Sequence, residues 1–277
     1  MGIRIATNVQ SLAAQRALGI NSGSQKASLE KLASGSRITK AADDAAGLAI
    51  SEKMKAEIRS LRQDNRNAQD GISMVQTAEG GMNEVGSMLI RFRELAIQAS
   101  SDTIGDKERG FIDKEVQQLK SEVNRIAAST EFNGKKLLNG EGEPLDIQVG
   151  THNNPEQDRF TFDPSKTNVT LDRLGLSGFE VTNKENARGA LDQIDSAIST
   201  VTENRADLGA VQNRLQSTIN NLNVYEENLS ASNSRIRDVD IASETSELTK
   251  ENILTAAGVS VLSQANQNAM LAMKLIG

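Results

Sequence analysis

Few side chains in this sequence could carry out chemistry. The 277 residues include a single histidine, His152, and no cysteine. A thiolate zinc site, a cysteine nucleophile, a disulfide framework and a cluster of histidine ligands are therefore excluded within one chain. His152 stands in Gly-Thr-His-Asn-Asn-Pro, a composition typical of a turn, and no G-x-S-x-G motif accompanies it. We interpret His152 as a solvated turn residue.

Two pairs of adjacent carboxylates are the remaining candidates for acid–base chemistry: Asp43 with Asp44, and Glu226 with Glu227. Adjacent residues on a helix do not face each other, so a helix cap or a solvated surface explains these pairs better than a catalytic dyad. The sequence has neither G-x-x-x-x-G-K-[ST] nor G-x-G-x-x-G, the motifs that cradle phosphate. We expect no enzyme activity, no cofactor and no metal.

The charge and aromatic content narrow the function classes further. There are 37 acidic and 31 basic side chains, which gives a formal net charge of −6. Nucleic-acid binding needs a basic surface to neutralise phosphates, so we expect no nucleic-acid partner. Aromatic residues make up only 3% of the chain, which is too few for an ordinary core built on large rings.

The prolines divide the sequence into three parts. All three, Pro144, Pro155 and Pro164, fall within one short window, and the long stretches on either side contain none. Proline breaks helix interiors because it lacks an N–H and clashes with the preceding turn. The sequence therefore predicts two long helical arms that flank a short non-helical insert.

In both arms, apolar residues recur at alternating steps of three and four. This spacing is sustained over many turns, which is typical of a coiled-coil seam. Met54 and Met82 fall on the same spacing and are interpreted as core residues. At about 1.5 Å per residue, a helix of ~50 residues is roughly 75 Å long, so we expect an elongated rod. The predicted rod-seam residues are Ile72, Val75, Leu89, Leu208, Val211, Leu215 and Leu222.

The proline-containing insert has the pattern of a hairpin. Apolar residues alternate with polar ones on both sides of the turn that contains His152, and a third short strand is possible after them. Asn133-Gly134 is a separate signal for a tight turn. The alternating residues are Leu145, Ile147 and Val149 before the turn, Phe160 and Phe162 after it, and Val169 and Leu171 in the possible third strand.

The two ends of the chain combine apolar ladders with few charges. Residues 252–273 contain no charged side chain, and the C-terminal ladder is apolar on two faces, which predicts neighbours on both sides. Polar residues among them make the segment unsuitable for membrane insertion. The N-terminal segment lacks the features of a cleaved secretory signal. The residues predicted to pack in this inner core are Ile5, Val9, Leu12, Leu248, Val259, Leu262, Asn266, Met273 and Ile276.

Some ladder residues allow two interpretations. Asn252 and Asn266 are costly in an apolar seam, where such residues commonly fix register or oligomeric state, but a solvated helix face also explains them. Met270 and Met273 fit core packing, with an adaptable interface as the alternative. We infer that both ends are helices packed between copies of the protein.

Several strings in both arms resemble one family, the bacterial flagellins. The resemblance covers residues 1–142 and 183–277, with the matching strings in the same order at both ends. They are LASGSRITKAADDAAGLAI (32–50), NRNAQDGISMVQTAEGGMNEV (65–85), RFRELAIQAS (91–100), EFNGKKLL (131–138), NLSASNSRIRDVDIASE (228–244) and AGVSVLSQANQNAMLAMKLIG (257–277).

The resemblance implies a mainly α fold: an elongated antiparallel helical coiled-coil rod with a small β-hairpin insert, in which the N- and C-terminal helices pair. Residues 1–42 and 237–277 would be the inner-core helices, and 43–142 and 183–236 the two parts of the helical rod. Residues 143–182 would be the hairpin insert. Only these residues separate the arms, so the outer domains of longer flagellins would be missing.

The resemblance also implies partners and a location. The subunit would be exported unfolded, without a cleaved signal, and would polymerise with copies of itself into the extracellular flagellar filament. Expected partners are an export chaperone, the filament cap and the hook–filament junction proteins. Toll-like receptor 5 is a further partner implied by the family, and the matching positions for its contact patch are Arg91, Leu95 and Glu115.

Two other functions are compatible with proline-free helical arms. A hook–filament junction protein shares terminal motifs with flagellin, but RELAIQAS together with SVLSQANQ favours flagellin. An intracellular coiled-coil signalling scaffold would show similar heptads, but it would not need termini that are nearly free of charge and apolar on two faces.

Overall fold

The computed structural model describes the backbone of residues 7–274 and, within this range, all side chains except those of residues 269 and 271–274. The chain forms two compact units. Unit 1 contains Met1–Ile58 and Glu227–Gly277, and unit 2 contains Arg59–Glu226. Unit 1 is therefore built from two segments that lie far apart in the sequence, whereas unit 2 is one continuous segment.

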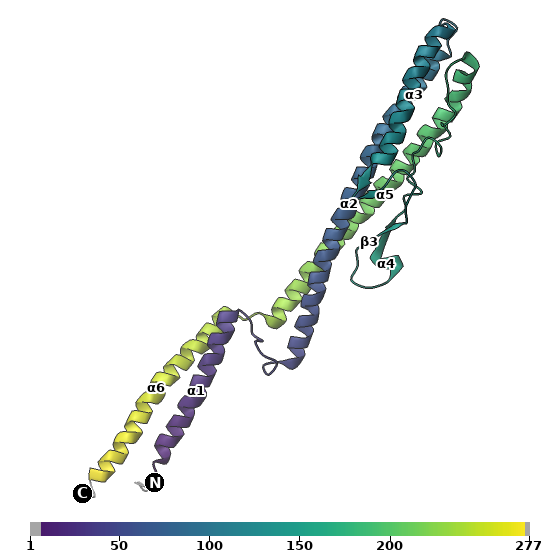
Figure 1. Ribbon diagram of the computed structural model, residues 1–277. Coiled ribbons are helices and arrows are strands. Elements are labelled where there is room, and N and C mark those ends of the chain that lie inside the picture. The colour runs from purple at the N-terminus through teal and green to yellow at the C-terminus, as the bar shows by residue number, and fades with distance from the viewer. Residues whose placement is uncertain (1–6, 275–277) are drawn as a thin grey trace. The chain divides into compact units, whose positions relative to one another are not determined.

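Helices dominate the described residues, and the expected mainly α class is confirmed (Figure 1). The expected pairing of the terminal helices and the hairpin insert are also confirmed. The helices are α1 (Val9–Ser34), α2 (Ala45–Ala99), α3 (Asp106–Ser129), α4 (Pro155–Asp158), α5 (Lys184–Arg237) and α6 (Ile241–Lys274). The strands are β1 (Glu131–Phe132), β2 (Lys135–Lys136), β3 (Leu145–Gln148) and β4 (Arg159–Phe162).

Local signals in the sequence explain where α1 begins and ends. The side chain of Asn8 accepts a hydrogen bond from the Ser11 backbone amide at 3.0 Å, which satisfies one of the free N–H groups of the first turn. At the other end, Gly35 has a φ of 68°, a left-handed conformation that glycine adopts without steric cost. Both ends of α1 are thus set by residues next to the helix.

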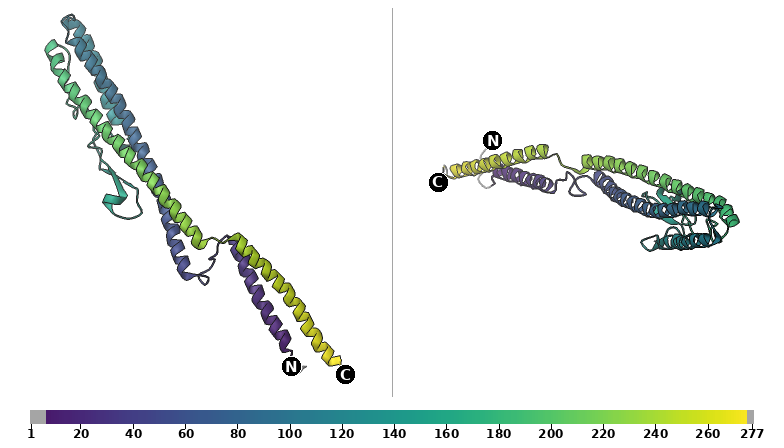
Figure 2. Two further views of the ribbon diagram at one scale, coloured as in Figure 1. Left: turned by 180° about the vertical axis from the view of Figure 1, so that it is seen from behind. Right: turned by 90° about the horizontal axis from the view of Figure 1, so that it is seen from above.

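In unit 2, α2, α3 and α5 lie side by side (Figures 1 and 2). Ion pairs show that α2 runs antiparallel to α5, since Arg62 pairs with Glu226 and Arg93 with Asp195. One hydrophobic cluster fills the space between the helices, and it includes Phe92, which meets the ring of Phe179 edge-on. The loop after β4 covers this cluster with buried apolar side chains.

The hairpin insert consists of β3 and β4, which pair antiparallel with Leu145 opposite Phe162 and Gln148 opposite Arg159. Its turn contains the short helix α4, which begins at Pro155. The possible third strand is not formed within the described residues. Val169 and Leu171 are buried in a turn-rich segment instead, and the Val169 amide donates to the Leu138 carbonyl at 3.0 Å. This hydrogen bond holds the segment over the hydrophobic core, and the segment does not extend the sheet formed by β3 and β4.

In unit 1, α1 and α6 run antiparallel (Figures 1 and 2). The side-chain amide of Asn8 donates to the Ala265 carbonyl at 2.9 Å, and Lys31 approaches Glu244 at 3.8 Å. Between these points, Gly258 lets Leu18 come close, because a Cβ at Gly258 would lie 2.8 Å from the Leu18 side chain. The two terminal segments therefore meet along α1 with few large side chains between them.

The two connections that join the terminal helices to the rest of unit 1 are bonded to each other. The Arg37 amide donates to the Arg237 carbonyl at 2.6 Å, and the Val239 amide donates to the Gly35 carbonyl at 3.1 Å. Arg37 also donates a side-chain hydrogen bond to the Ile236 carbonyl at 2.6 Å. These bonds hold the end of α1 beside the start of α6.

Candidate subunit-contact surface

The pair formed by α1 and α6 buries very little apolar surface. Among the described residues of these two helices, the buried apolar side chains are Ala14 and Ala265. The other buried residues are polar: Ser11, Ser28 and Glu251. Such an interface contributes little hydrophobic free energy, because the effect scales with the apolar area removed from water.

Large apolar side chains on both helices are instead exposed. Val9 is 64% exposed, and Val259 is 56% exposed, so these apolar side chains point into solvent in the single subunit. We call the exposed large apolar side chains of α1 and α6 the terminal apolar surface. Its members are Val9, Leu12, Ile20 and Leu29 on α1, and Ile241, Ile253, Leu254, Val259, Val261 and Met270 on α6.

The predicted inner-core residues fall into three groups. Val9, Leu12 and Val259 belong to the terminal apolar surface, and Asn266 is also exposed. Leu248 and Leu262 are half-buried. Ile5, Ile276 and the Met273 side chain lie outside the described residues.

The predicted seam of unit 2 is largely enclosed within the subunit. Val75, Leu89, Leu208 and Leu215 are buried. Ile72, Val211 and Leu222 are half-buried, the first two against the hydrophobic clusters. Unit 2 thus has a core of its own, whereas the α1–α6 pair does not.

Of the three residues in the expected receptor patch, the structure brings two together. The Arg91 guanidinium donates to Glu115 Oε1 at 2.8 and 2.9 Å, and both side chains are exposed. Leu95 was expected beside them, but it is only 1% exposed and belongs to the hydrophobic cluster. The reason is that α2 packs against α3 on one side and α5 on the other, so its buried face is wide enough to include Leu95.

Three of the four carboxylates considered for acid–base chemistry have structural partners: Asp43, Asp44 and Glu226. Asp43 Oδ2 accepts hydrogen bonds from the Thr39 amide, the Thr39 hydroxyl and the Lys40 amide, each at 2.9 Å. These bonds, with those of the backbone foremost, lower the pKa of Asp43. Asp44 accepts from the Gly47 amide at the start of α2, and Glu226 pairs with Arg62.

His152 is exposed, and its Nδ1 lies 3.0 Å from the Thr151 hydroxyl oxygen. No group of three metal-ligating side chains occurs in the part of the chain that the structure describes. Among the described helices, none combines the length and the hydrophobicity that a membrane-spanning segment requires.

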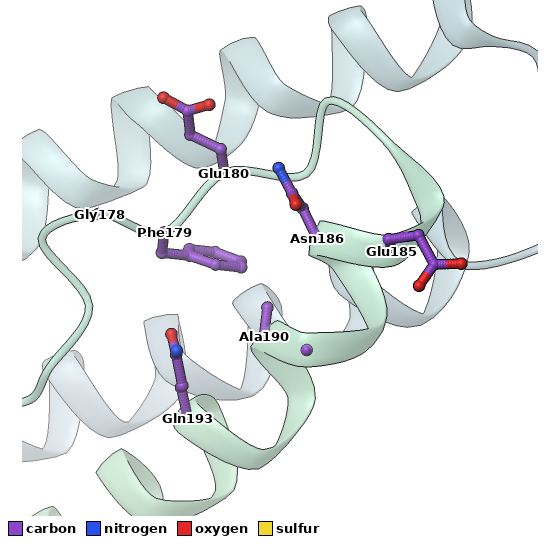
Figure 3. A pocket seen from close by; sticks show the side chains of 8 residues that line it. Gly178, Phe179, Glu180, Glu185, Asn186, Ala190 and Gln193 are labelled. Atoms are coloured by element: carbon purple, nitrogen blue, oxygen red, sulfur yellow. The ribbon is translucent and has the colours of Figure 1, made fainter.

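A hollow of about 300 Å³ lies beside the start of α5 (Figure 3). Two carboxylates line it, Glu180 and Glu185, and Figure 3 shows them pointing away from each other. Phe179, Asn186 and Gln193 add no nucleophile or base to them. The hollow therefore offers no catalytic set.

Sequence reasoning missed a buried arginine that holds the turn between α2 and α3. Arg109 is 7% exposed, and its guanidinium donates to the Ala99 carbonyl at 2.9 Å, the Ser101 carbonyl at 3.0 Å and Asp106 at 2.7 Å. It satisfies carbonyl groups that the end of α2 leaves free. The sequence offered one sign of this role. Asp106 stands three positions before Arg109, a spacing at which opposite charges on a helix form an ion pair.

Comparison with known proteins identifies the relatives of the chain. The model of the bacterial flagellin N-terminal helical region matches residues 5–143, and that of the C-terminal helical region matches residues 191–273. A flagellin of Halalkalibacterium halodurans is 45% identical over 269 residues, covering 97% of this chain and 98% of that protein. A flagellin of Bacillus subtilis is 39% identical over 306 residues, covering 99% and 100%.

Solved structures of flagellar proteins are similar to this chain in fold. A flagellin of Bacillus cereus superposes with a TM-score of 0.51 at 28% identity, covering 57% of this chain and 88% of that one. A putative flagellar hook-associated protein of Vibrio parahaemolyticus superposes with a TM-score of 0.58, covering 71% and 100%, but at 11% identity it shares the fold alone. The flagellin family models and the flagellin relatives do not favour the hook–filament junction and signalling-scaffold alternatives.

Proposed function

Because the chain belongs to the bacterial flagellin family and is a structural subunit of the flagellar filament, we propose that it polymerises through the terminal apolar surface of α1 and α6. In this proposal each subunit presents its exposed ladders to neighbouring copies, and these copies cover them. The filament core is then the place where the two helices acquire the hydrophobic contacts that they lack in the single subunit.

The observation that carries this proposal is the contrast between the two units. Unit 2 encloses residues such as Leu89 and Leu215 completely, whereas Val9, Ile253 and Val259 remain more than half exposed. Fully burying one such side chain contributes about 1.5–3 kcal/mol. Several of them on each subunit supply enough free energy to drive association and to stabilise α1 and α6 as neighbours are added.

The test is the substitution Val259→Asp, which places a charge on the terminal apolar surface. Val259 is exposed in the subunit, so the variant should fold as the unchanged protein does. Burying an unpaired charge between subunits is costly, so seeded polymerisation followed by electron microscopy should give no filaments. Val259→Ala is the control, because it removes only part of the apolar area and should slow elongation without preventing it. Normal filaments from Val259→Asp would contradict the proposal.

The further partners follow from the same surface. We propose that an export chaperone covers α6 before export, and that the subunit leaves the cell without a cleaved signal to assemble beneath the filament cap, on top of the junction proteins. An unassembled subunit with exposed Ile253 and Val261 would otherwise aggregate.

For Toll-like receptor 5, the exposed Arg91–Glu115 pair is the part of the expected patch that a receptor reaches without rearrangement of α2.

A further inference from the structure

The dipeptide Asn-Gly occurs twice in the segment that follows α3, and the structure holds the two copies differently. Asn133-Gly134 forms the turn between β1 and β2, and Asn139-Gly140 lies in the loop before β3. Asn-Gly is the dipeptide in which an asparagine side chain is most open to attack by the backbone, because glycine has no Cβ to hinder the approach. The environment of each copy therefore determines how readily its asparagine side chain reacts.

Both reacting groups of Asn133-Gly134 are free. Asn133 is exposed and has a φ of 49°, the one positive φ of a non-glycine residue in the part of the chain that the structure describes. Its side-chain amide makes no hydrogen bond with other described residues, and neither does the backbone amide of Gly134. The side-chain carbonyl carbon and the backbone nitrogen that would attack it are both accessible to water.

The second copy is restrained at the same atoms. Asn139 Nδ2 donates to Glu141 Oε2 at 2.9 Å, and Asn139 Oδ1 accepts from the Glu141 backbone amide at 3.0 Å. Gly140 is also crowded, since a Cβ there would lie 2.3 Å from the side-chain nitrogen of Asn168. Rotation of the Asn139 side chain toward Gly140 requires that both hydrogen bonds break.

We propose that Asn133 is a site of spontaneous deamidation in the folded protein and that Asn139 is protected from the same reaction. Hydroxide takes the proton of the Gly134 backbone amide, and the nitrogen anion attacks Cγ of Asn133. The bond from Cγ to the side-chain nitrogen breaks, and the NH2 group takes a proton from water and leaves as ammonia. The product is a five-membered succinimide. Water then adds to one of its two carbonyl carbons and opens the ring, which gives aspartate or isoaspartate. No oxidant, reductant or cofactor takes part.

The isoaspartate product alters the backbone of the turn. Its main chain passes through the former side chain, which adds one backbone atom between β1 and β2. Only two residue pairs form this hairpin, Glu131 with Lys136 and Phe132 with Lys135, so the added atom disturbs the register directly. The next residue, Leu137, is buried and donates its amide to the Thr130 carbonyl at 3.2 Å. Conversion of Asn133 to isoaspartate should weaken the hydrogen bond between Leu137 and Thr130 and make the packing of the β1–β2 hairpin on the core less stable.

The experiment compares the two copies within one molecule. The full chain is incubated at mildly alkaline pH, once folded and once in denaturant, and peptides are mapped by mass spectrometry with an isoaspartate methyltransferase assay. In denaturant both copies should convert at similar rates. In the folded protein Asn133 should convert roughly five- to thirtyfold faster than Asn139, because two hydrogen bonds restrain the latter.

Two variants sharpen the result. Glu141→Ala removes one restraint and should raise the rate at Asn139 while leaving Asn133 unchanged. Asn133→Gly keeps a glycine-compatible turn and removes the reactive side chain, so its Leu137 amide should keep its protection from hydrogen exchange during incubation. The proposal is overturned if folded Asn139 converts as fast as Asn133, or if Asn133 converts in denaturant but not in the folded chain.

Discussion

Asp64 on α2 is 5% exposed, and its Oδ2 atom has no hydrogen-bond partner among the described residues. Burial raises the pKa of this carboxyl group, and the nearby carboxylate of Asp158 raises it further. Asp158 belongs to the hairpin insert and already accepts a hydrogen bond from the Asn154 amide at 2.9 Å. Two carboxylates thus meet where the insert packs on α2, and Asp64 destabilises the folded state whenever it is ionised.

Replacing Asp64 by asparagine should therefore stabilise the protein. A raised pKa means that the folded state binds the proton more readily than the unfolded state does. The destabilisation by ionised Asp64 is therefore fully present above the pKa of the folded state. It disappears as the pH falls below the pKa of Asp in the unfolded state, about 3.9. Near pH 7, Asp64→Asn should increase the free energy of unfolding by about 1–3 kcal/mol, and this gain should shrink as the pH approaches 4. Urea denaturation at several pH values measures both effects.

The matched control for Asp64 is Asp70→Asn, since Asp70 is an exposed carboxylate on the same helix. It should give a much smaller gain, because an exposed charge keeps its hydration. A loss of stability in Asp64→Asn near pH 7 would show that the ionised carboxylate has a favourable partner. A gain that does not change with pH would argue against its charge as the cause.

At the scale of the helices, the difference between the units lies in how many faces of each helix are covered. α2 has α3 on one side and α5 on the other, and Leu89 is completely buried between them. α1 has α6 as its neighbour, and Leu12 remains 53% exposed. A leucine at an apolar ladder position therefore stabilises the subunit in α2, whereas in α1 it is available to another subunit.

The pair Leu89→Ala and Leu12→Ala tests this distinction with the same chemical change. Leu89→Ala leaves a cavity in a close-packed cluster and should lower the free energy of unfolding by about 2–5 kcal/mol. Leu12→Ala should change the stability of the free subunit by less than about 0.5 kcal/mol but slow its polymerisation. Thermal unfolding and filament elongation rates provide the two readouts. Equal destabilisation by both variants would mean that α1 is enclosed within the subunit.

At the scale of the whole molecule, unit 2 contains complete hydrophobic clusters, whereas many large apolar residues of unit 1 are exposed on its surface. The boundary between the units, at 58/59 and 226/227, lies within α2 and α5. We expect unit 2 to keep its fold without the terminal helices, because every residue of both clusters lies between Arg59 and Glu226.

A fragment comprising residues 59–226 should therefore unfold cooperatively and remain monomeric. Circular dichroism during heating and analytical ultracentrifugation measure these properties, and seeding with filaments should not incorporate the fragment, since it lacks α1 and α6. The full chain under the same conditions is the control. If the fragment is unfolded, the core of unit 2 depends on the termini; if it adds to filaments, the assembly surface lies elsewhere.

Much of the fold follows from local patterns in the sequence. The three prolines confine the helix breaks to one insert, and the spacing of apolar residues identifies the helical arms, because both signals act within a few turns of the chain. The alternation around His152 likewise predicts the hairpin. Charge and composition argue against nucleic-acid binding and against cysteine or histidine chemistry, and the flagellin-like strings at both ends carry the family assignment.

The direction in which each apolar side chain points was decided by tertiary structure alone. Leu89 and Val9 were both predicted to be packing residues of helices, yet Leu89 is 0% exposed and Val9 is 64% exposed. The same holds for Asp64, whose burial depends on the insert that packs over it. Periodicity shows that a helix has an apolar face but not which distant segment covers it, because that contact depends on register between residues far apart in the chain.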